Sequence, residues 1–69
     1  MLYKQVIIDY LKTLSFPINK TDLITNVKAF MNSNYPLDHT LETTYGSIDN
    51  ISDQSYASSD EAIAAMFPG

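Results

Sequence analysis

The stretch FPINKTDL, residues 16–23, ends one helical pattern and begins another. Pro17 lacks a backbone N–H and disfavours a helical conformation at the residue before it, so the preceding helix should end just before this stretch. Asn19 is the expected N-cap of the next helix, because its side-chain oxygen can accept the free backbone N–H of Thr21 or Asp22. The carboxylate of Asp22 would then face the positive end of the helix, an interaction that contributes about 0.3–1 kcal/mol.

The same stretch also carries apolar residues that fix how the chain enters this second helix. Ile18 lies just before the expected cap and Leu23 at the fourth helical position, which is the spacing of a hydrophobic staple. Phe16 lies close to both in sequence. The turn is therefore expected to form a small core of its own.

Apolar residues recur at spacings of three and four on both sides of this turn, which is typical of amphipathic helices. The first stripe consists of Tyr3, Val6, Ile7, Tyr10, Leu11 and Leu14, and the second of Leu23, Ile24, Val27, Phe30 and Met31. We predict an all-α fold, a compact orthogonal bundle of about four short helices at roughly residues 2–15, 20–32, 36–46 and 59–67. One domain should cover residues 1–69.

The third of these helices is expected to begin at Pro36, because proline suits the first helical turn. Leu37, Leu41, Tyr45 and Ile48 would then line its inner side. Gly46 would cost about 1 kcal/mol inside a helix, so it could instead end the helix and leave irregular chain behind it.

The fourth helix has a capping signal of its own. Ser58 is the expected N-cap, and Glu61, three residues later, could reach back to the Ser58 backbone in a capping box. Tyr56, just before the cap, is expected to point inward. So short a helix is stable only when it is docked against the rest of the domain.

Size and composition limit what the protein can be. A chain of 69 residues without cysteine has neither disulfides nor thiolate metal sites, and a domain of this size buries only about 60% of its unfolded surface. The net charge is −4, and the only cations, all lysines, lie at or before Lys28. An acidic surface without arginine argues against nucleic-acid binding. The absence of a long apolar run argues against membrane insertion, and we expect a cytoplasmic protein.

Few residues could carry chemistry. His39 is the only histidine, and on a helix it could meet Asp38 and Glu42 on one face, which would be a weak metal site or general base. His39 should nevertheless point away from the apolar stripe into water. The segment of residues 49–53 is rich in oxygen ligands but lacks the glycine and glutamate of a calcium loop, so we interpret it as a turn. We expect no enzyme activity, no cofactor and no metal.

Two groups of residues follow a pattern seen in a known family. They are Tyr10, Leu11, Leu14, Phe16, Pro17, Asn19, Lys20, Asp22, Leu23 and Ile24, and then Asp53, Tyr56, Ser58, Glu61 and Ala62. This pattern resembles the small bacterial domain of unknown function, family 2795, over roughly residues 6–66. The resemblance implies a similar fold, and the family supplies no activity, cofactor or catalytic residue.

These observations favour a non-enzymatic protein-interaction or regulatory module that acts through an apolar-aromatic patch with an acidic rim. The candidate partner-binding residues are Tyr35, Asp38, Glu42 and Tyr45, because tyrosines beside acidic residues are typical of interfaces. The occupant would be an unidentified protein partner or a second copy of the chain. The alternative is a helix-turn-helix-like nucleic-acid-binding domain, although its third helix would lack lysine and arginine. A third hypothesis is an acyl-carrier-like protein modified at Ser47.

Overall fold

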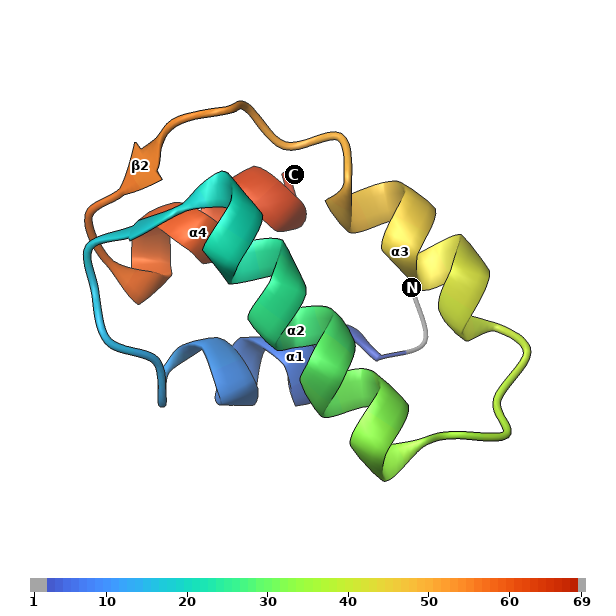
Figure 1. Cartoon of the computed structure of the whole chain (residues 1–69). Helices are drawn as coiled ribbons and strands as arrows, with labels where there is room; N and C mark the ends of the chain where they lie inside the picture. The colour runs from blue at the N-terminus through green and yellow to red at the C-terminus, as the bar shows by residue number, and fades with distance from the viewer. Residues whose placement is uncertain (1–2, 69) are drawn as a thin grey trace.

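The computed structural model describes residues 3–68 of the chain, and these form four α-helices and two very short strands (Figure 1). In chain order the elements are α1 (Lys4–Leu11), β1 (Ile18–Asn19), α2 (Lys20–Asn34), α3 (Leu41–Ile48), β2 (Ser55–Tyr56) and α4 (Ser59–Met66). The fold is therefore mostly helical, as predicted, but the expectation of a purely all-α fold was wrong.

The strands connect the two halves of the chain. β1 pairs with β2 in antiparallel fashion, with Ile18 opposite Tyr56 and Asn19 opposite Ser55. α2 follows β1 directly, and α4 follows β2 after Ala57 and Ser58, so the pairing brings together the two chain segments that lead into these capped helices (Figure 1). Two residues per strand are too few to stand alone, and the pairing depends on the helices packed around it.

The turn between α1 and α2 has the expected cap. The Oδ1 atom of Asn19 accepts the backbone N–H of Asp22 at 2.8 Å, and the Asn19 backbone is extended. α1, however, ends at Leu11 and not near residue 15. The Thr13 hydroxyl and backbone N–H both bond to the carbonyl of Tyr10, which replaces the helical bonding pattern with a tighter turn. α2 continues to Asn34, two residues beyond the predicted end.

The predicted start of the third helix was wrong. α3 begins at Leu41 because Asp38 organises a turn instead: its Oδ1 atom accepts both the backbone N–H and the hydroxyl of Thr40, at 2.8 and 2.7 Å. Leu37 consequently lies in the loop and is 87% exposed, not on the inner stripe. Gly46 lies inside α3, so it does not end the helix, which continues to Ile48.

The fourth helix begins where predicted. The Ser58 hydroxyl accepts the backbone N–H of Glu61 at 3.3 Å. The Glu61 carboxylate accepts the N–H of Ala57 at 3.1 Å, so the return bond of the expected capping box goes one residue further back than Ser58. The helix ends at Met66, one residue before the predicted end, and Phe67 is its C-cap.

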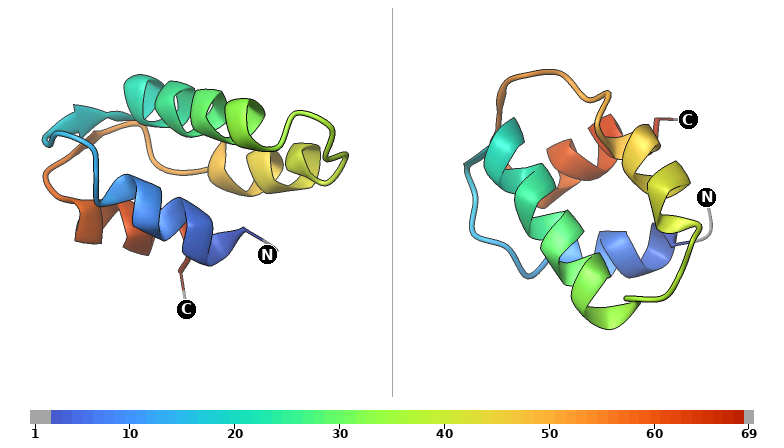
Figure 2. Two further views of the ribbon diagram at one scale, coloured as in Figure 1. Left: turned by 90° about the horizontal axis from the view of Figure 1, so that it is seen from below. Right: turned by 45° about the vertical axis from the view of Figure 1, so that its right-hand side comes forward.

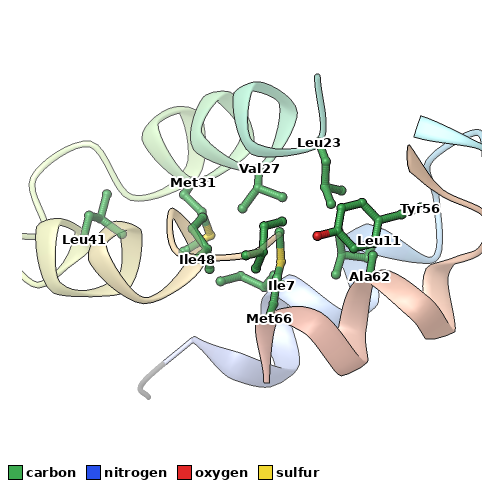
Figure 3. Close-up of a cluster of buried hydrophobic side chains, with 11 residues drawn as sticks. Ile7, Leu11, Leu23, Val27, Met31, Leu41, Ile48, Tyr56, Ala62 and Met66 are labelled. Carbon is green, nitrogen blue, oxygen red and sulfur yellow. The ribbon is translucent and has the colours of Figure 1, made fainter. Parts of the chain in front are cut away.

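One hydrophobic core joins the helices. α2 lies on one side of the molecule, and α1 and α4 lie on the other (Figure 2). The α2 side chains of Val27 and Met31 point toward Ile7 and Met66, and Leu23 points toward Tyr56 (Figure 3). Among residues 3–68, the buried core consists of Ile7, Leu11, Leu23, Val27, Met31, Leu41, Ile48, Ile51, Tyr56, Ala62 and Met66. α3 packs chiefly against α2, so it forms one edge of the domain (Figure 1).

Two expectations about the core are confirmed. Ile48, predicted on the inner side of the third helix, is fully buried. Tyr56 is fully buried, and its hydroxyl donates to the carbonyl of Ser52. Burial raises the pKa of the Tyr56 hydroxyl, and the nearby carboxylates of Glu61 and Asp53 raise it further.

Candidate partner-binding site

A hollow of about 420 Å³ opens where the C-terminal part of α2, the following loop and α3 meet. We call it the α2–α3 hollow. It is lined by Asn32, Pro36, Asp38, His39, Leu41, Glu42 and Tyr45. Its size lies in the range of small-ligand pockets, and its lining combines apolar, aromatic and acidic groups.

Three of the four predicted site residues meet in this hollow. Asp38 comes from the loop, and Glu42 and Tyr45 come from α3. Glu42 and Tyr45 are three residues apart on the helix, so their side chains leave α3 from neighbouring positions. The structure therefore brings together the acidic and aromatic groups that the sequence suggested would act together.

The Tyr45 side chain is held in place by α2. Its hydroxyl donates to the Oδ1 atom of Asn32 at 2.8 Å and lies 3.4 Å from the carbonyl oxygen of Lys28. The Lys28 ammonium lies 5.3 Å from the centre of the Tyr45 ring, in the geometry of a cation–π contact. Partial burial raises the pKa of Tyr45, and the charge of Lys28 opposes this. The ring is thus a fixed wall of the hollow.

Lys28 also links α2 to the end of α3. Its Nζ atom lies 3.0 and 3.1 Å from the two carboxylate oxygens of Asp49, which is the C-cap of α3. Both side chains are partly exposed, so the ion pair itself contributes about 0–1 kcal/mol. Its more important effect is that the charge of Lys28 is already compensated.

The Asp38 carboxylate is ionised at neutral pH, because its pKa is lowered from its usual value. The bond from the Thr40 hydroxyl lowers its pKa most, followed by the bond from the Thr40 backbone, and the neighbouring His39 adds to this. Asp38 therefore both shapes the loop and places a negative charge at the hollow.

The fourth predicted residue, Tyr35, lies elsewhere. It is the C-cap of α2, and its ring packs against the ring of Tyr3, with the two centres 4.7 Å apart. Tyr35 is half-buried and belongs to the contact between the start of α1 and the end of α2. It does not line the α2–α3 hollow.

The possible metal site at Asp38, His39 and Glu42 required these three residues to lie on one helix, and they do not. Asp38 and His39 both precede α3, so the helical spacing to Glu42 does not apply. His39 is exposed, as expected, and lines the hollow. Within residues 3–68, no group of three or more histidine, aspartate or glutamate side chains is placed to hold a metal ion.

The oxygen-rich segment after α3 is occupied by structural contacts. Asp49 pairs with Lys28, and the Asn50 side chain donates to the carbonyl of Gly46 at 2.9 Å. Ser47, the residue of the carrier-protein hypothesis, is exposed in the last turn of α3, and its hydroxyl bonds to the carbonyl of Thr43.

Sequence reasoning missed several residues of the site. Asn32, Pro36 and Leu41 line the hollow, and Leu37 is exposed in its loop. The signal that could have found them is the Asp-x-Thr pattern of residues 38–40, since an aspartate side chain often bonds to the backbone two residues on and so starts a turn. That turn competes with a helix beginning at Pro36.

No protein-family model, no curated protein and no solved structure matches this chain. The resemblance to family 2795 therefore remains a hypothesis. In the part of the chain that the structure describes, no helix has the length and apolar character needed to cross a membrane.

Proposed function

We propose that this chain is a non-enzymatic protein-interaction or regulatory module. The surface that supports this proposal is the α2–α3 hollow together with Leu37, which lies in the chain between the lining residues Pro36 and Asp38. We call this surface the docking patch. Leu37 is the large hydrophobic side chain with the greatest exposure among residues 3–68, at 87%.

We also retain the expectation that the helices cross at steep angles, as in an orthogonal bundle.

The proposal rests on one observation: the exposed Leu37 occurs together with a hollow that has an aromatic wall and two carboxylates. A single exposed apolar residue is ordinary on a protein surface. Here it lies in a loop that also contributes Pro36 and Asp38 to a concave surface. Interfaces commonly combine a concave apolar centre with a polar margin.

The alternative, a nucleic-acid-binding domain, has less support from the residues of α3. α3 would be the helix presented to DNA, but it carries Glu42 and neither lysine nor arginine. Phosphate contacts supply most of the affinity of non-specific DNA binding, and they require cations. A titration with duplex DNA at low salt that gave saturable binding would favour the alternative.

Affinity capture from the native host, with matched variants, tests the proposal. Leu37→Ser removes the exposed apolar side chain, and because Leu37 makes few contacts in the fold, its melting temperature should stay close to that of the original chain. Ala64→Ser is the control, because Ala64 is exposed on α4, away from the docking patch. We expect a partner to be retained by the original chain and by the control and to be lost with Leu37→Ser.

Two results would contradict the proposal. One is a chain that stays monomeric by sizing and captures no partner. The other is a partner that binds all three proteins equally, which would place the interface outside the docking patch.

A further inference from the structure

The charges around the docking patch indicate the chemistry of its occupant. Asp38, Glu42 and His39 are the titratable acidic and basic groups in the lining of the hollow, and among residues 3–68 no lysine or arginine lines it. Lys28, the cation that contacts Tyr45, is paired with Asp49. From residue 29 to the end of the chain there is no further lysine or arginine. The hollow is therefore negative, and its neighbouring cation is already engaged.

The two carboxylates differ in what they can still bind. The Oδ1 atom of Asp38 already accepts two hydrogen bonds from Thr40. Glu42 is exposed, and within residues 3–68 its carboxylate accepts no hydrogen bond from another side chain or from the backbone. Both of its oxygens are thus open to a donor from outside, and a planar pair of N–H donors suits a carboxylate best.

The aromatic wall favours the same kind of donor. Tyr45 is fixed by its bond to Asn32, and the Lys28 ammonium lies over its ring, so a second cation would need the opposite ring face or the ring edge. Guanidinium groups stack on aromatic rings and bind carboxylates through two parallel hydrogen bonds, which an ammonium group cannot do. Glu42 and Tyr45 are three residues apart on α3 and both line the hollow, so a guanidinium paired with Glu42 would lie close to the Tyr45 ring.

We propose that the docking patch binds an extended segment of a partner protein in which an arginine is flanked by apolar residues. The guanidinium enters the α2–α3 hollow beside Glu42 and Tyr45, and a flanking apolar side chain packs on Leu37. This inference rests on the proposed function and specifies the partner's chemistry. A second copy of the chain is a poorer occupant, because each copy carries a net charge of −4 and the hollows of two copies would bring like charges together.

The test uses the full-length, ¹⁵N-labelled chain and three probes followed by NMR. The first probe is a capped five-residue peptide with a central arginine between two leucines. The second replaces the arginine with glutamate, and the third is N-acetylarginine amide alone. We expect saturable shifts of backbone amides in residues 32–45 with the first peptide and none with the second. The arginine derivative alone should bind at least about tenfold more weakly, because it lacks the apolar contact.

Matched variants separate the patch from general electrostatics. Glu42→Gln and Asp53→Asn each remove one negative charge, and both residues are exposed. We expect Glu42→Gln to weaken peptide binding about fivefold and Asp53→Asn to change it less than twofold. Leu37→Ser should weaken binding about tenfold and abolish the advantage of the peptide over the arginine derivative.

The proposal is overturned if the two charge variants weaken binding equally, if the shifts map to another surface, or if the glutamate peptide binds as well. Shifts of the same amides with protein concentration alone would assign the patch to self-association. Each of these failures leaves the interaction function standing if capture of a native partner still depends on Leu37. Failure of the capture experiment, in contrast, removes the function itself.

Discussion

Gly46 offers a direct test of where α3 ends, because two interpretations of this residue predict effects of opposite sign. As a helix terminator it would need a conformation that alanine tolerates poorly, so Gly46→Ala would destabilise the protein. In the structure it lies within α3, and its φ is not positive. A Cβ atom added to Gly46 would meet nothing within 4 Å.

The size of the effect follows from these observations. Alanine is better than glycine in a helix interior by about 0.8–1.0 kcal/mol, mainly because it has less backbone entropy to lose on folding. The new methyl group is exposed and neither clashes nor packs, so no further gain or loss is expected. For a domain of this length, 1 kcal/mol corresponds to a rise in melting temperature of about 4–8 °C.

Urea denaturation followed by circular dichroism measures the change. We expect Gly46→Ala to raise the denaturation midpoint with an unchanged slope, which indicates a change in stability alone. Gly46 lies outside the docking patch, so affinity for the arginine peptide should stay the same. A lower midpoint would refute the placement of Gly46 inside the helix.

Three further predictions concern stability and protonation. Asn19→Ala should lower the free energy of unfolding by about 1 kcal/mol in urea denaturation, since α2 loses its cap; loss of partner binding with unchanged melting would instead move the site to the turn before α2. Leu11→Ala should cost about 2–5 kcal/mol in the same assay, because the side chain is fully buried. Burial raises the pKa of Tyr56 above its usual 10.0, so the folded state favours the neutral hydroxyl. The contribution of Tyr56 to the free energy of unfolding is therefore complete below pH 10 and is lost as the pH rises through the folded pKa. Tyr56→Phe should therefore lose less stability than the original chain in an alkaline titration.

The sequence predicts the helix starts at Asn19 and Ser58 because capping is local. Each cap joins a side chain to a backbone N–H three residues later, so all the partners lie within one turn. The pairing of Ile18 with Tyr56 joins distant parts of the chain through strands of two residues each. Strands this short leave no alternating pattern in the sequence, so the strand pair could not be foreseen.

The start of α3 depends on a competition between two local signals of similar strength. Pro36 favours a first helical turn, whereas Asp38 favours a turn closed by Thr40. The sequence contains both signals and does not rank them. Of the predicted site residues, Asp38, Glu42 and Tyr45 line the α2–α3 hollow, and whether they bind a partner stays a prediction. The sequence did not indicate the lining residues whose position depends on the loop.

The same competition decides whether the docking patch exists. In a helix that began at Pro36, Leu37 would lie one turn before Leu41 and would share its buried face. The turn at Asp38 instead leaves Leu37 in water, and the domain forgoes the roughly 1.5–3 kcal/mol that burial of a leucine contributes. For a small domain this is a sizeable fraction of the total stability.

A partner that covers Leu37 would recover this free energy as affinity, in addition to any ion pair with Glu42. The two contributions come from different side chains on different elements, the loop and α3, so they should be separable by mutation. Leu37→Ser and Glu42→Gln combined in one chain should weaken binding of the arginine peptide by about the product of their separate effects. A combined effect equal to that of one variant alone would mean that the leucine and the carboxylate contact the same group, and that the flanking apolar residue of the partner has no separate contact.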